Sequence, residues 1–221
     1  MKRLLIIAAL FTINAQAATF DTDNVVSADE ANYWPWGDSR NTRYQLWLSE
    51  DMLNGYSGEI SDLTFFTVAP SDRSASWDIN VYLSTTSVNA SALSATNLDN
   101  NGGLDRTLVF DGIASIAEDD LSLAINLNDD FIYSGTGNLL IDIVFKSFNG
   151  VGGPLWQAVD HNSKFYRVTS HSSEGNGVFD RGAIRTEIEF EDNDVPEPAS
   201  IALLAAGLLG LGVSSRKSLQ A

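Results

Sequence analysis

The 221-residue chain contains no cysteine and only two histidines, and its 13 basic residues face 29 acidic ones. Without cysteine there can be no disulfide, no thiol nucleophile and no thiolate metal ligand. The formal net charge of −16 repels phosphate backbones, so nucleic acid is not an expected partner. Stability must come from a hydrophobic core, and the chain is long enough to bury one.

The sequence also lacks the motifs of common hydrolases, with no Gly-x-Ser-x-Gly and no His-Glu-x-x-His. A triad of Asp160, His161 and Ser172 can be imagined, but neighbouring strand residues point to opposite faces. Among 29 acids some pair must lie close, so proximity alone would not identify a glycosidase. We therefore expect no enzyme, and a secreted hydrolase acting on matrix polysaccharide is the alternative.

The first 17 residues have the three parts of a signal peptide. Lys2 and Arg3 form a basic start, residues 4–11 form an apolar centre, and Ala15 and Ala17 flank Gln16 as a small-residue cleavage signature. The apolar centre is too short to span a bilayer, which needs about 20 residues. Cleavage is expected before Ala18, which predicts export into an oxidising compartment.

A second apolar stretch lies near the C-terminus. Residues 199–215 carry no charge, and as a helix they would span roughly 26 Å, the lower limit for a bilayer core. Pro196 and Pro198 mark its start, and Arg216 and Lys217 follow it and should remain cytoplasmic. This pattern predicts a short transmembrane helix with the globular part outside.

The segment 195–217, with Pro196-Glu197-Pro198, a Gly-rich apolar run and Arg216-Lys217, resembles the PEP-CTERM sorting signal. The resemblance implies a membrane protease of the exosortase type as partner and transient anchoring in the inner membrane of a Gram-negative bacterium. It further implies release to the cell surface or to an exopolysaccharide matrix, as in biofilms.

Between these ends, residues 18–194 read as one domain. Its apolar residues alternate with polar ones, as in half-buried strands. The segments are YQLWLS, ISDLTFFTV, WDINVYLS, TLVFDG, LSLAINLN, LLIDIVFK, KFYRVTS and AIRTEIEFE. In LSLAINLN, for example, Leu121, Leu123, Ile125 and Leu127 should share a face. Gly- and Asn-rich turns separate the segments, and Ser49–Leu53 is the one local helical candidate.

About eight antiparallel strands predict an all-β fold of two packed sheets, a jelly-roll-like β-sandwich. The order of features resembles a β-sandwich module of secreted, surface-anchored bacterial proteins. The resembling stretches are residues 43–66, 78–87, 108–112 and 127–145. Such modules are mostly accessory, so the resemblance implies a fold and no catalytic activity.

Aromatic residues outside the alternating segments form the candidate ligand site. Tyr33, Trp34 and Trp36 surround Pro35, and Trp156 lies in another loop with Asp160 nearby. Rings and polar neighbours together suit sugar rings, which stack on tryptophan. The other interpretation is that these rings fill the ends of the core, as is expected of Trp47 and Trp77.

Calcium is the metal that the acidic loops could hold, although no cofactor is expected. Asp99, Asn101 and Asp105 lie on a Gly-rich loop, and Asn128–Asp130 offers further oxygen atoms, but neither completes an EF-hand pattern. The sequence thus predicts an exported structural or interaction protein of the surface or matrix, with weak glycan binding as a further hypothesis.

Overall fold

The computed structural model describes residues 17–24, 30–32, 35–36, 42–71, 73–150, 152–160, 165–170 and 177–191, with the backbone alone at 30–32 and 160. The predicted signal peptide and transmembrane helix lie outside these ranges, apart from Ala17. Within them, no helix is long and apolar enough to cross a membrane. Residues 17–191 belong to one unit with its own core.

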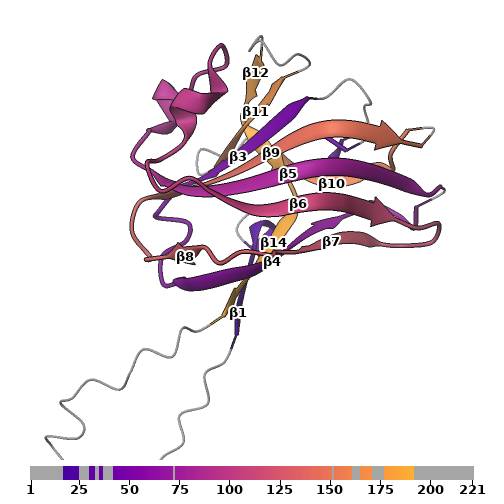
Figure 1. Cartoon of the computed structure of the whole chain (residues 1–221), viewed down its shortest axis with the longest axis horizontal. Coiled ribbons are helices and arrows are strands. Elements are labelled where there is room, and N and C mark those ends of the chain that lie inside the picture. Colours follow the sequence, from indigo (N-terminus) through magenta and orange to yellow (C-terminus); the bar gives the residue numbers. More distant parts are fainter. Residues whose placement is uncertain are drawn as a thin grey trace, which may run out of the picture. The chain divides into compact units, whose positions relative to one another are not determined.

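The strands of this unit are numbered in chain order (Figure 1). Their bounds are β1 Ala18–Asp21, β2 Glu30–Asn32, β3 Arg43–Leu48, β4 Gly58–Phe66, β5 Ala75–Thr86, β6 Thr107–Ile116, β7 Ser122–Asn126, β8 Ile132–Tyr133, β9 Asn138–Asn149, β10 Trp156–Asp160, β11 Phe165–Ser170, β12 Gly177–Asp180, β13 Gly182–Ile184 and β14 Thr186–Glu191. The described residues also include three short 3₁₀ helices, which are η1 Thr22–Asn24, η2 Ala90–Ala92 and η3 Leu98–Asn101. The all-β prediction is confirmed.

Two large antiparallel sheets form the layers. The six-stranded sheet has the order β12-β11-β3-β9-β5-β6, and its long strands β9, β5 and β6 lie side by side in Figure 1. The five-stranded sheet has the order β1-β14-β4-β7, with β8 also paired to β4. A three-stranded sheet, β13-β10-β2, is linked to the end of β4 by a bridge between Thr67 and Trp156.

The core lies between the sheets, and the predicted alternation places most of it. Trp77, Ile79, Val81 and Leu83 of β5 are each at most 1% exposed. Leu121 is a correction, because it precedes β7 in a turn, is 59% exposed, and uses its carbonyl to accept the N–H of Thr67 at 2.9 Å. The position of Leu121 is therefore set by the hydrogen bond of the turn and not by the alternation of the strand.

A second, smaller core lies on the outer face of the six-stranded sheet, which is the face turned away from the main core. Trp47, Leu140 and Tyr166 form it, and Ala90 and Leu93 pack against it. The last two belong to residues 87–106, the connection between β5 and β6, which we call the covering segment. Its 3₁₀ helices are the magenta turns beside β11 and β3 in Figure 1.

Candidate functional site

Two residues of the predicted aromatic site, Trp36 and Trp156, do not form an exposed platform. Trp36 and Trp156 are both 0% exposed, and with Trp77 they form a core cluster whose ring centroids are 5.3 to 6.4 Å apart. Buried rings cannot offer a face to a sugar, so these two tryptophans are core residues, as the other interpretation expects. Trp47 lies in the second core instead of at an end of the main one.

The remaining predicted residues fall mostly outside the described ranges. These are Tyr33, Trp34, His161, His171, Ser172, the cleavage residue Ala15, and the sorting residues Pro196, Glu197, Pro198, Arg216 and Lys217. Asp160 ends β10, and its backbone pairs with Gly182. Ala17 and Ala18 are exposed, and Ala18 begins β1.

The oxygen atoms of the proposed calcium loop bind the protein itself. Asn101 is 0% exposed, and its amide donates to Gln45 Oε1 at 2.8 Å and accepts the N–H of Ser94 at 2.7 Å. Asp105 accepts the N–H of Thr85 with both carboxylate oxygens, and Asp99 pairs with Arg43 at 2.8 Å. Within the described ranges, no group of three His, Asp or Glu side chains could hold a metal ion.

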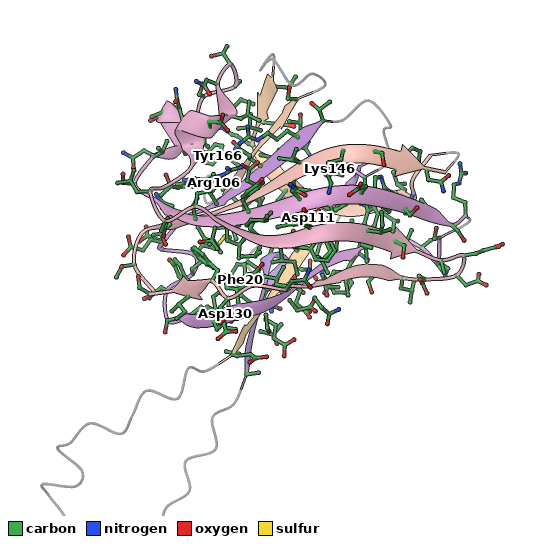
Figure 2. All side chains as sticks on the ribbon, viewed as in Figure 1. Phe20, Arg106, Asp111, Asp130, Lys146 and Tyr166 are labelled. Carbon is green, nitrogen blue, oxygen red and sulfur yellow. The ribbon has the colours of Figure 1, made fainter. Side chains whose placement is uncertain are left out.

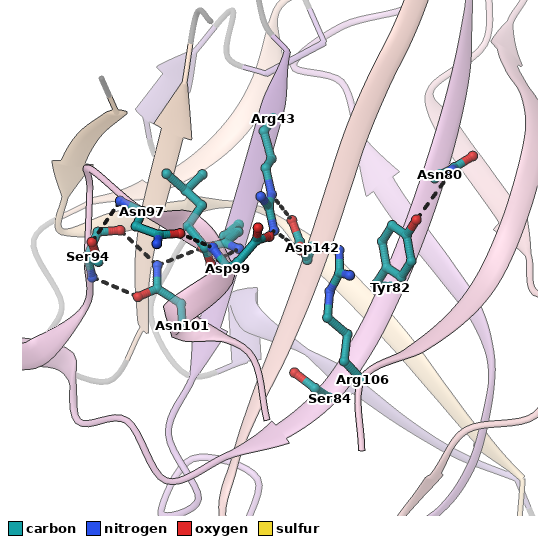
Figure 3. A network of polar contacts seen from close by, with 12 residues as sticks. Arg43, Asn80, Tyr82, Ser84, Ser94, Asn97, Asp99, Asn101, Arg106 and Asp142 are labelled. Carbon is teal, nitrogen blue, oxygen red and sulfur yellow. Dashed lines mark hydrogen bonds and ion pairs between the residues drawn. The ribbon is translucent and has the colours of Figure 1, made fainter. Parts of the chain in front are cut away.

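An ion network fixes the covering segment to the sheet (Figure 3). Asp142 on β9 is 2% exposed and accepts hydrogen bonds from Arg43 at 2.7 and 2.8 Å and from Arg106 at 3.0 Å. Burial acts to lower the pKa of Arg43, but the hydrogen bonds and charges of Asp142 and Asp99 outweigh it and raise that pKa. The guanidinium of Arg106 also lies 3.6 Å from the centre of the Tyr82 ring.

Beside this network, the covering segment and the sheet border an open groove of about 830 Å³. We call it the outer-face groove. Its lining is Trp47, Ser49, Glu50, Asp51, Thr86, Ser87, Asn89, Ala90, Ser91, Gly137, Asn138 and Tyr166. A second hollow of about 540 Å³ shares Thr86, Ser87 and Gly137 with it, so the two adjoin.

The floor of the groove is aromatic. The rings of Trp47 and Tyr166 meet edge to face with centroids 5.7 Å apart. Tyr166 in turn stacks on Phe179 of β12 at 5.2 Å and 19°. Phe179 is 40% exposed, so the row of Trp47, Tyr166 and Phe179 runs from a buried floor to an open ring at the edge of the sheet.

Hydrogen bonds fix the walls. Trp47 Nε1 donates to the carbonyl of Val88 at 2.9 Å, and Asn138 Nδ2 donates to the same oxygen at 3.2 Å. The hydroxyl of Tyr133 donates to the carbonyl of Gly137 at 2.6 Å, while burial and then the charge of Glu50 raise the pKa of Tyr133 to about 12. Tyr133 therefore stays a donor at neutral pH.

Gly137 is needed where the wall turns. Its φ of +83° is in the left-handed region, and a Cβ there would lie 2.7 Å from Cγ2 of Thr85. The groove wall thus depends on a residue without a side chain, next to one of the strand ends that frame the site.

The alternation of apolar and polar residues in two strands contained a signal for this site. In YQLWLS, Trp47 falls on the polar side of the strand with Gln45, and in KFYRVTS, Tyr166 falls opposite Phe165. Register pairs Tyr166 with Trp47 across β11 and β3. An aromatic residue on the outward face of each of two strands indicates a covered surface, but not which segment covers it.

Two comparisons bear on the identity of the chain. The model of the PEP-CTERM protein-sorting motif matches residues 194–217, which confirms the predicted signal at 195–217. No curated protein matches the chain. The motif indicates an exported protein that is sorted at its C-terminus, and it implies processing by exosortase, a membrane enzyme, after transient anchoring in the membrane.

Proposed function

We propose that this exported protein is a non-catalytic binding module of the cell surface or extracellular matrix, and that its outer-face groove binds polysaccharide. The observation that carries the proposal is the groove itself. Trp47 and Tyr166 form its floor, amide, hydroxyl and carboxylate groups form its wall, and the open ring of Phe179 stacks on Tyr166 outside the lining. Sorting at the C-terminus supports a place outside the inner membrane of a Gram-negative bacterium.

The chemistry of the lining fits sugars. A sugar ring presents an apolar C–H face and a rim of hydroxyl groups, and a binding site for it combines aromatic surface with directional polar groups. One face of the Phe179 ring packs on Tyr166, and the exposed part of the ring can receive a sugar. Asn89, Ser91 and Asn138 line the groove and supply donors and acceptors.

The alternative of a secreted hydrolase has one observation in its favour, because Glu50 and Asp51 line a concave groove. Glycosidases place two carboxyl groups on opposite sides of the scissile bond. Glu50 and Asp51 are chain neighbours in the turn after β3, an arrangement that favours one shared side. Binding without cleavage is therefore the function that we propose.

The test is affinity electrophoresis or calorimetry of the exported, processed protein with the exopolysaccharide of its own producing strain. Phe179→Ala should weaken binding about two- to tenfold, the effect of losing one aromatic contact. Ile113→Ala is the matched control, since Ile113 is 63% exposed on β6 at the opposite edge of the same sheet, and it should bind normally.

Equal binding by Phe179→Ala and the wild-type protein would contradict the proposed site. Absence of binding by the wild-type protein to any matrix polysaccharide would reject the proposed function. New reducing ends released during incubation would favour the hydrolase, and we expect none.

A further inference from the structure

The charge of the outer-face groove has one sign. Its twelve lining residues include two acids, Glu50 and Asp51, and no lysine, arginine or histidine. The adjoining hollow adds Asp105 and again no basic residue. A ligand in this groove therefore meets a negative potential, which disfavours polymers of uronic acids or sulfated sugars.

The two groove acids also differ from the other carboxylates on the same face of the sheet. Asp142, Asp78 and Asp111 all form ion pairs with arginine or lysine. Glu50 and Asp51 are exposed, and among the residues that the structure describes neither carboxylate has a cationic partner. Their charge is available to a ligand.

A buried polar group in the lining of the groove adds an independent observation. Ser49 lines the groove, and its Oγ is buried with no hydrogen-bond partner among the residues that the structure describes. Buried polar groups are nearly always paired, so an unpaired hydroxyl at the surface of a groove indicates a position where a ligand atom or water binds. Figure 2 shows Tyr166, another lining residue of the groove, at the end of the sheet where the covering segment lies.

We propose that the groove selects a polysaccharide with free amino groups, that is, a polymer of amino sugars that lack N-acetyl caps on part of their units. The ammonium groups would pair with Glu50 and Asp51, and the sugar hydroxyls would bond to the Ser49 hydroxyl and the amides of the wall. This inference rests on the proposed function and adds the class of polymer to it.

The experiment compares two probes with the same backbone. Chitosan oligosaccharides carry free amines, and N-acetylated chitin oligosaccharides of the same length have them capped. Calorimetry with the exported, processed protein at low ionic strength should show tighter binding of the free-amine probe, by about two- to fivefold for each carboxylate that forms an exposed ion pair. Raising the salt concentration should reduce this preference.

Variants separate the groove from the net charge. The double variant Glu50→Gln with Asp51→Asn should abolish the preference for the free-amine probe. It should leave the fold intact, because Glu50 is bonded to Asn138 through its backbone N–H and not through its carboxylate. The matched control is Glu118→Gln with Asp129→Asn, which removes two exposed carboxylates outside the groove lining and should retain the preference.

Each outcome decides a separate claim. Equal binding of both probes, or loss of the preference in the control pair, would overturn the amine inference while leaving the binding function intact. Failure of either probe to bind at the groove, together with no binding of the strain's own exopolysaccharide, would remove the proposed function itself. The inference is supported if the control variant keeps the preference for the free-amine probe and the groove variant loses it.

Discussion

The two outer faces of the sandwich differ in whether their carboxylates are paired with cations. On the six-stranded sheet, Asp142 is buried under the covering segment between Arg43 and Arg106, and Lys146 lies between Asp78 at 2.6 Å and Asp111 at 2.5 Å. Each of these carboxylates has a cation, and the buried one has two.

On the five-stranded sheet, Asp21 of β1 is paired with Arg185 at 2.6 Å, but the acids of β4 and β14 face one another. Register places Glu189 opposite Asp62 and Glu191 opposite Glu59. Burial, followed by the charge of Asp130, raises the pKa of Glu59, and burial and Glu189 raise that of Asp62. Burial and Asp21 raise the pKa of Glu187, although Arg185 acts to lower it.

The difference shows what a cover requires. A carboxylate that is withdrawn from water must be paired, because an uncompensated buried charge is strongly destabilising. A face left to solvent tolerates repulsion, since water and salt screen it. The outer-face groove lies at the margin of the cover, where Glu50 and Asp51 are still solvated and have no cationic partner among the described residues.

Removing the central anion of the covered face should produce the largest effect. Asp142→Ala leaves Arg43 and Arg106 without their shared partner, and should lower the free energy of unfolding by about 3–5 kcal/mol in urea titrations. Asp111→Ala, on the exposed Lys146 pair of the same sheet, is the control and should change little. Equal losses in the two variants would show that burial does not separate the two pairs.

Loosening the cover itself should have an intermediate effect. Asn101→Ala removes the buried amide that joins Gln45 to Ser94, and should cost about 2 kcal/mol while speeding hydrogen exchange of amides near residues 94–101. Its neighbour Asn100 is exposed, so Asn100→Ala serves as the control. Unchanged exchange in Asn101→Ala would mean that other contacts hold the segment.

Relieving repulsion on the open face should have the smallest effect. Glu189→Gln should stabilise the domain by roughly 0.5 kcal/mol, seen as a rise of about 1–2 °C in Tm at pH 7.5. The pKa values of Glu59, Asp62 and Glu187 are raised in the folded protein, so on acidification it binds protons at a higher pH than the unfolded chain does. The free energy of unfolding therefore decreases as pH rises through these folded-state pKa values.

The advantage of Glu189→Gln should therefore disappear near pH 4, where carboxyl groups protonate, and shrink in about 1 M salt. Glu118→Gln changes the net charge equally and lies outside this sheet, so it should not shift Tm in the same way. A pH-independent gain for Glu189→Gln would indicate packing and not charge.

Period-two alternation was enough to predict the long strands, because Trp77 to Leu83 or Leu139 to Phe145 must turn every second residue into the core. Short strands such as β2, β8 and β12 have too few residues to show a period. The core position of Trp36 and Trp156 could not be distinguished from a loop platform, since neither lies in an alternating run.

The groove was missed for another reason. It depends on a pairing of β11 with β3 and on a 20-residue connection folded over that pair, and both are contacts between distant parts of the chain. Local sequence shows that Trp47 and Tyr166 point outward, but only tertiary structure brings them together with Phe179.

The order of strands in the five-stranded sheet has a consequence for export. β14 lies between β1 and β4, and Ala18 pairs with Phe190, so the middle strand of this layer is the last strand in the described part of the chain. A chain threaded through a translocation channel from its N-terminus cannot complete the layer until Glu191 has emerged. The sorting motif begins three residues later, at 194. The five-stranded layer is therefore completed only as the sorting motif follows it out of the channel.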